Sequence, residues 1–503
     1  MSLRKNVLAN YVSQLYVMVI GIVMVPLYVK YMGAEAYGLV GFFAMLQAWF
    51  YLLDMGLTPT MSREMARFNG GAYDALSIRR LLRALEAIFF GVAVLGAVAI
   101  LLSSDLIASN WLKVQALPLV EVQRAIMLMA VIVSLRWISG LYRGAINGLE
   151  HQIWLSTLNL AVATARFVLV IPFFFIAGTT PTAFFFYQLV IAVLECLFLI
   201  TKTYHLLPKV PVGARIPWQF QPLRNVLKFS LTIAFTSSIW VIVTQTDKLV
   251  LSKLLPLSDY AFYTIAVLVA SGISMISGPI SIALLPRLTR LSAENDEAGL
   301  IRLYRQATQF VGVLVIPASL VLALFAQQIL WTWTGDLELA QKAAPVLSLY
   351  ALGNGFLALG AFPYYFQYAK GDLKMHLIGN VLFVIFLIPG LIFATLRYGS
   401  TGAGYAWLSA NAIQFFLWIP LVHRRFVNGL HSQWLTDVTA IALVSTIIAI
   451  LCQRILVWPQ GRFLVLIEIL GISFIILAAA AAASSWVRMT VLQRWNRHMA
   501  SVD

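Results

Sequence analysis

The stretch that decides the fold reads NVLANYVSQLYVMVIGIVMVPLYVKYMGAEAYG at residues 6–38. A similar pattern, NVLKFSLTIAFTSSIWVIVTQTDKLVLSKLLPLSDY, begins about 220 residues later and occupies residues 225–260. Each copy starts a set of hydrophobic segments, which predicts a membrane bundle built from two similar halves. Such halves can rock against each other around a shared cavity near the middle of the bilayer. The repeat therefore predicts a transport mechanism.

The composition is typical of a chain that lies in a bilayer. Apolar residues make up 61% of the sequence, charged residues only 11%, and the mean hydropathy is +0.86. A helix needs about 20 apolar residues to cross a hydrocarbon core of about 30 Å. We therefore expect an all-α polytopic membrane protein with about fourteen transmembrane helices. They are predicted at residues 7–29, 37–57, 82–102, 122–142, 153–177, 182–201, 226–251, 261–285, 310–330, 345–365, 376–396, 404–423, 438–458 and 463–486.

The net charge of +15 is explained by where the basic residues stand. In a soluble protein this charge would favour a nucleic-acid partner. Here most of the 35 Lys and Arg residues fall on one side of the predicted helices, so we expect no nucleic acid. That side includes Arg63, Arg136, Arg143 and Arg287, and the positive-inside rule makes it cytoplasmic. Both termini are expected on the same side.

Four prolines mark the boundary between the halves. Pro208, Pro211, Pro217 and Pro222 lie in a basic connector, where they discourage continuation of a helix. We predict an N-terminal six-helix lobe at 1–205, a cytoplasmic connector at 206–221 and a C-terminal six-helix lobe at 222–425. Residues 426–503 are predicted to form two additional transmembrane helices and a cytoplasmic tail.

Enzymatic signatures are absent from the sequence. It contains no H-E-x-x-H or G-x-S-x-G motif and no cysteine–histidine spacing that would bind a metal. The predicted outer loops are also too short to hold a catalytic domain. We therefore expect no enzymatic activity, no catalytic residue, no metal and no cofactor.

Three glycines recur at every fourth position, Gly140, Gly144 and Gly148. Small residues at this spacing let two membrane helices approach closely. A phosphate-binding loop is the alternative, but no Gly-Lys-Ser or Gly-Lys-Thr follows. We favour close helix packing.

Arg166 is the leading candidate for substrate binding, because it lies near the middle of a predicted span. A charged side chain there costs about 2.5–3.5 kcal/mol and normally faces a bundle interior or a wet cavity. Ser156 and Asn159 lie on the same helical face, so the stripe is polar with a cation at its centre. The alternative is a structural role, with Arg166 held by backbone carbonyls or by Glu195.

Polar residues at equivalent positions of the two repeats suggest one shared cavity. The first span carries Asn10, Ser13 and Gln14, and the seventh carries Thr232, Thr236, Asp247 and Lys248. Ser13 and Thr232 occupy matching repeat positions. A local ion pair between Asp247 and Lys248 explains those two residues equally well.

Four further charged residues are candidates. Arg63 and Arg287 stand at corresponding helix ends, where they could receive an anionic headgroup, although membrane orientation alone also explains them. Glu195 and Glu468 are intramembrane carboxylates. They could carry protons, or each could be a neutral, hydrogen-bonded acid.

Nearly the whole chain resembles a known family. The likeness is carried by Val25–Gly33 with Tyr37–Leu39, by Arg143–Glu150, and by Thr246–Leu249 with Tyr260–Tyr263. These stretches resemble polysaccharide-repeat (O-antigen type, Wzx-like) flippases of the MOP exporter superfamily, which have a MATE-like fold. The resemblance implies a V-shaped pair of six-helix bundles whose first and seventh helices line a cationic lumen containing Arg166.

The resemblance also implies an activity. Such a protein moves an undecaprenyl-diphosphate-linked oligosaccharide from the cytoplasmic to the periplasmic leaflet of the bacterial inner membrane, in polysaccharide and lipopolysaccharide biosynthesis. Coupling to an H⁺ or Na⁺ gradient and contact with polysaccharide polymerase machinery are compatible with it. Two alternatives stay open, a lipid-linked peptidoglycan-precursor flippase and a multidrug cation antiporter. The antiporter predicts acidic residues at the cavity centre, and Arg166 argues against it.

Overall fold

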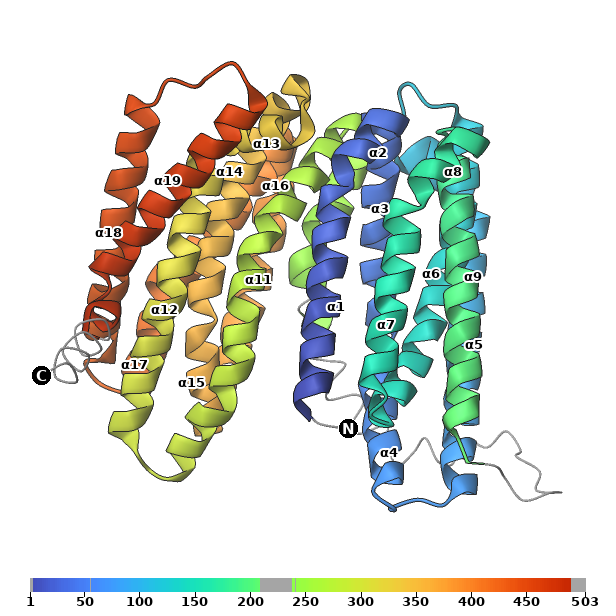
Figure 1. The fold of residues 1–503 in the computed structure, drawn as a ribbon, viewed down its shortest axis with the longest axis horizontal. Helices are drawn as coiled ribbons and strands as arrows, with labels where there is room; N and C mark the ends of the chain where they lie inside the picture. The colour runs from blue at the N-terminus through green and yellow to red at the C-terminus, as the bar shows by residue number, and fades with distance from the viewer. Residues whose placement is uncertain (1–2, 55, 209–237, 240, 490–503) are drawn as a thin grey trace, which may run out of the picture. The chain divides into compact units, whose positions relative to one another are not determined.

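The computed structural model describes residues 3–54, 56–208, 238, 239 and 241–489 (Figure 1). The described residues form helices, turns and loops, with one isolated β-bridge between Lys113 and Pro256. Contacts divide the chain into two compact units, Met1–Ala261 and Phe262–Asp503. The predicted connector at 206–221 lies mostly outside the described residues. The lobe boundaries given above stay a prediction.

In the first unit, α6, Leu119–Gly148, packs against α3, α4, α5 and α9 (Figure 1). Buried residues occur along α6 from Val122 to Gly148. The other elements are α1 (Leu3–Val23), α2 (Val25–Met32), α3 (Ala34–Phe50), η1 (Tyr51–Asp54), α4 (Leu57–Asn69), α5 (Ala75–Leu106), η2 (Ile107–Trp111), α7 (Gln152–Ala163), η3 (Thr164–Val168), α8 (Val170–Ala177) and α9 (Pro181–Leu206). The unit is thus built around a largely buried central helix, α6.

The second unit is built around α12, Glu297–Leu324, which packs against α14, α18 and α19. Its core includes Tyr304, Phe362, Phe366 and Trp434, all nearly inaccessible to solvent. The remaining elements are α11 (Leu257–Ala293), which starts in the first unit, α13 (Ala326–Thr334), α14 (Leu337–Gly360), α15 (Phe362–Lys370), α16 (Lys374–Ile413), η4 (Gln414–Trp418), α17 (Ile419–Phe426), α18 (Leu430–Ile455) and α19 (Arg462–Ala483).

The prediction of an all-α polytopic membrane protein is confirmed. Among the described residues, 12 stretches are long and apolar enough to cross a membrane. One of them, Lys374–Phe426, covers the two spans predicted at 376–396 and 404–423, and the backbone is non-helical between them at Gly399 (φ 59°, ψ −140°). Much of the span predicted at 226–251 lies outside the described residues. The count of fourteen therefore stays a prediction.

The three regularly spaced glycines pack α6 against α4. A Cβ atom on Gly144 would lie 2.6 Å from the carbonyl oxygen of Thr58, and one on Gly148 would lie 2.1 Å from that of Ser62. Neither separation is possible without moving the backbone, since real Cβ atoms essentially never approach this closely. The prediction of close helix packing is confirmed.

Candidate functional site

Three arginines and one glutamate form a polar cluster inside the first unit. Arg136 and Arg143 come from α6, Arg166 from η3 and Glu195 from α9. Arg136 and Arg143 are seven residues apart, about two helical turns, so they share one face of α6. We call these four residues the arginine cluster.

Arg136 is the most deeply buried arginine of the cluster, with 7% of its surface exposed. Its guanidinium donates to the side-chain oxygens of Gln47, at 2.8 Å, and Gln188, at 3.3 Å. It also lies 4.9 Å from the centre of the Phe43 ring. These partners are neutral, so they do not offset the positive charge, and the buried Nε atom of Arg136 has no hydrogen-bond partner among the described residues.

Arg143 connects α6 to two other helices. Its guanidinium donates to the amide oxygen of Asn159 on α7 and to the carboxylate of Glu195 on α9. Glu195 is 5% exposed, and its second oxygen, Oε2, is buried without a hydrogen bond from any described residue. Glu195 thus offsets the charge of Arg143, and Asn159, predicted to bind substrate, contacts Arg143.

Arg166 lies on a π-helical turn, η3. A π-helical turn disturbs the regular pattern of backbone hydrogen bonds and often marks a functional position. Here Tyr187 donates to the carbonyl of Ala165, at 2.8 Å, and Gln188 donates to that of Arg166, at 2.9 Å. Gln188 therefore joins Arg166 to Arg136.

The guanidinium of Arg166 is less satisfied than those of the other two arginines. Among the described residues it forms no hydrogen bond, and its Nε atom is buried. The Nε atom of Arg136 is also buried without a partner there, but two other nitrogens of Arg136 form hydrogen bonds. The alternative in which Glu195 holds Arg166 differs from the geometry found, because Glu195 forms its ion pair with Arg143. The cluster carries three guanidinium groups and one carboxylate, an excess of positive charge within three candidate spans. Such an arrangement can bind a multiply charged anion.

The polar face predicted on the first span is partly formed. Gln14 donates to Asn10 at 3.2 Å across one turn of α1. Ser13 is only 1% exposed, and its hydroxyl has no hydrogen-bond partner among the described residues. The equivalent residues of the second repeat, Thr232 and Thr236, lie outside the described residues.

Asp247 and Lys248 form the local ion pair that was one of the two interpretations. The Lys248 ammonium lies 3.5 Å from the Asp247 carboxylate and donates to the carbonyl of Thr244 at 2.6 Å. The backbone N–H of Lys248 donates to the same carboxylate at 2.7 Å. A role in substrate binding stays a prediction for both residues.

Arg63 and Arg287 lie in different units, on α4 and α11. Arg63 lies 3.3 Å from Glu64, a carboxylate that Arg67 also contacts at 3.2 Å. Tyr73 donates to Glu64 at 2.6 Å, and this hydrogen bond raises the pKa of Tyr73. Arg287 is exposed. Glu64 thus offsets part of the positive charge that was expected at the helix end carrying Arg63.

Glu468 lies on α19, apart from the arginine cluster. Its Oε2 atom is buried and has no hydrogen-bond partner among the described residues. It lines an apolar cavity of about 360 Å³ with Ile448, Cys452 and Ile472. No cluster of three or more metal-binding side chains occurs in the described ranges.

The sequence analysis misplaced two arginines of the cluster. It counted Arg136 and Arg143 with the basic residues of the cytoplasmic face, although its predicted span at 122–142 contains Arg136. Both lie within the candidate span Leu119–Gly148, and Arg136 is buried. The spacing of seven residues was the available signal, together with the polar Gln47 and Gln188 inside neighbouring spans. The partners of these side chains depend on packing between helices, which helical spacing alone does not specify.

Comparison with known proteins identifies related families. The family model for polysaccharide biosynthesis protein matches residues 3–292, more than half of the chain. A second model, MatE, matches residues 232–393. A Shigella flexneri protein that is provisionally named an O-antigen transporter is 20% identical over 414 residues, which cover 81% of this chain and 94% of the relative.

Two solved structures share the fold. The lipid II flippase MurJ, in an inward closed conformation, matches with a TM-score of 0.75 and 15% identity, covering 94% of this chain and 98% of MurJ. An inward-facing multidrug resistance MATE family transporter of the MOP superfamily matches with a TM-score of 0.63 and 17% identity, covering 82% of this chain and 94% of that transporter. At these identities the likeness establishes the fold. Because its family model spans more than half of the sequence, this chain belongs to the polysaccharide biosynthesis protein family.

Proposed function

We propose that this chain is a flippase for an undecaprenyl-diphosphate-linked oligosaccharide. It moves the lipid-linked sugar from the cytoplasmic to the periplasmic leaflet of a bacterial inner membrane by alternating access. The family and the relative named for O-antigen transport support this substrate class. The observation that carries the proposal is the excess of positive charge in the arginine cluster, which lies within predicted spans.

The chemistry of the substrate matches this charge. A diphosphate bearing sugars faces a large desolvation penalty in hydrocarbon, because its charges and hydroxyl groups lose their water. Guanidinium groups replace that water with charge-assisted hydrogen bonds and can bind phosphate oxygens in pairs. Arg136 and Arg166 retain positive charge for this role, whereas Glu195 offsets that of Arg143. The prenyl chain can stay in the lipid during transport.

The energy source is part of the same proposal. The protein works as a transporter without catalysis or a bound cofactor, and transport draws on an H⁺ or Na⁺ gradient. Glu195 and Glu468 are the carboxylates proposed to take part in coupling. Both termini lie in the cytoplasm, and polysaccharide polymerase machinery is the proposed partner that receives the product.

A lipid-linked peptidoglycan-precursor flippase is the second candidate. It is favoured by the helices α18 and α19, which follow the twelve predicted core spans, and by the fold shared with MurJ. A multidrug cation antiporter is less compatible with the cluster, because Glu195 is already paired with Arg143.

A deletion strain tests the substrate. We expect lipid-linked repeat units to accumulate and surface polysaccharide to disappear, with both effects reversed by the gene in trans. Accumulation of a peptidoglycan precursor, followed by lysis, would instead identify the second candidate.

A vesicle assay tests the coupling. The purified protein is reconstituted with lipid-linked sugar, and the H⁺ or Na⁺ gradient is then collapsed with an ionophore. We expect the amount of sugar reaching the opposite leaflet to fall. Unaltered flipping after collapse of both gradients would remove Glu195 and Glu468 from the proposal.

A further inference from the structure

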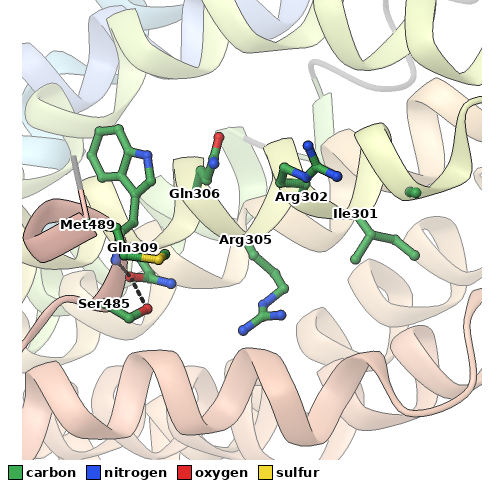
Figure 2. Close-up of a pocket in the computed structure, with 9 residues that line it drawn as sticks. Ile301, Arg302, Arg305, Gln306, Gln309, Ser485 and Met489 are labelled. Atoms are coloured by element: carbon green, nitrogen blue, oxygen red, sulfur yellow. Dashed lines mark hydrogen bonds between the residues drawn. The ribbon is translucent and has the colours of Figure 1, made fainter. Parts of the chain in front are cut away.

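A second cationic pocket lies in the second unit, far along the sequence from the arginine cluster (Figure 2). Its volume is about 370 Å³, and it lies between the start of α12 and the segment that follows α19. Its lining combines two arginines and two glutamines with apolar and aromatic side chains, and includes Ile301, Arg302, Arg305, Gln306, Gln309, Trp486 and Met489. Nothing in the proposed transport cycle uses this pocket.

One wall of the pocket is fixed by Gln309. This side chain is 4% exposed, and its oxygen accepts hydrogen bonds from the hydroxyls of Ser484, at 2.8 Å, and Ser485, at 3.2 Å, and from the backbone N–H of Trp486, at 3.0 Å. Figure 2 shows the contact between Gln309 and Ser485. The buried amide oxygen of Gln309 accepts three hydrogen bonds from the segment after α19, and these hold that segment against α12. Hydrogen bonds therefore fix the position of this wall of the pocket.

The two arginines of the pocket differ in their contacts. Arg305 lies 2.7 Å from the carboxylate of Asp437 on α18 and also donates to Gln433 at 2.9 Å. Arg302 is exposed and forms no ion pair with any residue that the structure describes. In Figure 2, Arg302 and Gln306 project to one side of α12 and Arg305 to the other. Arg302 is thus the cation available to a ligand.

We propose that this pocket binds the headgroup of an anionic glycerophospholipid from the adjacent leaflet. The guanidinium of Arg302 binds the phosphate, which its planar arrangement of donors suits, and the amide of Gln306 donates a further hydrogen bond. Trp486 supplies an amphipathic ring of the kind enriched at membrane interfaces, and Ile301 and Met489 contact the start of the acyl chains. Basic pockets between transmembrane helices are typical sites for acidic lipids.

The size of the pocket favours a headgroup rather than a whole lipid. A volume of about 370 Å³ holds roughly a dozen water molecules, which is enough for a glycerophosphate group. Acyl chains would extend along the apolar surface of the helices, as they do for lipids around any membrane protein. This inference does not depend on what the protein transports. A lipid bound here would hold the segment after α19 to α12.

A photo-cross-linking experiment tests the proposal on the full-length protein. The protein is placed in phosphatidylcholine nanodiscs that contain a small fraction of photoactivatable phosphatidylglycerol, and the labelled peptides are mapped. We expect labelling of peptides containing residues 298–309 or 485–489. In Arg302→Gln this labelling should fall about fivefold to tenfold, because the loss of the arginine weakens the free energy of lipid binding by about 1 kcal/mol or slightly more. Arg302→Lys should retain part of it.

Arg290→Gln is the matched control. Arg290 is also an exposed arginine of the second unit, but it pairs with Glu294 and lies outside the pocket. Its labelling should equal that of the wild type. A thermal melt of each variant shows whether it is folded, and a second variant, Gln306→Ala, tests the pocket should Arg302→Gln not fold.

Competition identifies the source of the phosphate. Unlabelled phosphatidylglycerol should displace the probe, while added phosphatidylcholine or millimolar inorganic phosphate should not. Two results would overturn the proposal: equal labelling of the wild type by a photoactivatable phosphatidylcholine, or undiminished labelling of the Arg302→Gln and Gln306→Ala variants by the phosphatidylglycerol probe. So would displacement by inorganic phosphate or preferential displacement by a prenyl diphosphate, since the first indicates a free-anion site and the second a substrate site.

Discussion

Arg143 donates to the carboxylate of Glu195, an ion pair between α6 and α9 inside the first unit. The pair joins the two candidate spans Leu119–Gly148 and Pro181–Leu206, where an uncompensated charge would be costly. Because Glu195 is committed to Arg143, the cluster keeps a net positive charge at Arg136 and Arg166. With two arginine charges left without a counter-charge, the cluster can bind an anion, which a neutral structural network could not.

Arg166 is expected to be essential for transport. Arg166→Ala should abolish export, because the guanidinium of Arg166 forms no hydrogen bond with any described residue, unlike those of Arg136 and Arg143, and is therefore the most available to phosphate. Arg166→Lys should keep partial function, since the charge survives while the paired hydrogen bonds of a guanidinium are lost. The measurement is surface polysaccharide in a complemented deletion strain, with membrane levels of each variant determined in parallel.

Arg124→Gln is the control for that experiment. Arg124 lies on α6 like Arg136, but it is exposed and lies outside the cluster. Export should be unaffected by this change. Normal export by Arg166→Ala at wild-type protein levels would remove Arg166 from the mechanism.

Removing one charge of the Arg143–Glu195 ion pair should destabilise the first unit more than replacing both residues with apolar side chains. Glu195→Gln leaves Arg143 without its counter-charge, and losing one partner of a buried pair costs about 3–5 kcal/mol. The double variant Arg143→Met with Glu195→Leu should be closer to the wild type, because no charge stays uncompensated. Thermal unfolding in detergent compares the two. A double variant less stable than Glu195→Gln would contradict this account.

Gly148 should not tolerate even one added methyl group. The Cβ atom of Gly148→Ala would lie 2.1 Å from the carbonyl oxygen of Ser62, so α4 and α6 would have to separate. Overpacking of this kind costs about 1–3 kcal/mol and should lower the melting temperature. Gly91→Ala on α5 is the control, since nothing lies within 4 Å of its Cβ position. Equal melting temperatures for the two variants would be inconsistent with the close contact.

Glu35 should order the loop that precedes α6. Its carboxylate accepts hydrogen bonds from the backbone N–H groups of Gln115, Ala116 and Leu117, at 2.5, 2.8 and 3.0 Å. In Glu35→Ala we expect hydrogen exchange at residues 115–117 to be about tenfold to a hundredfold faster, since hydrogen bonds to charged groups contribute about 1.5–3 kcal/mol.

Two comparisons check the assignment of Glu35. Glu35→Gln keeps the acceptor oxygen and should show an intermediate rate, and Asp105→Ala, a change at an exposed acid, should leave the loop as it is. Exchange in Glu35→Ala that matches the wild type would show that other contacts order the loop.

Several features of the fold could be predicted because they depend on local sequence. The length and hydropathy of each segment decide whether it can span a bilayer, and this identified the spans at 122–142 and 182–201. The spacing of Gly140, Gly144 and Gly148 predicted a close helix contact, because residues four apart lie on one face. It did not specify that the partner helix would be α4.

The sequence by itself determined an all-helical membrane protein of a recognisable family, with Arg166 as an intramembrane cation. Only the tertiary structure decided that Glu195 pairs with Arg143 rather than Arg166, and that Arg136 is buried against Gln47 and Gln188. The physical reason is that helical periodicity specifies which residues share a face. The identity of a side chain's partner depends on how neighbouring helices are rotated and packed, which residues distant in the sequence jointly determine.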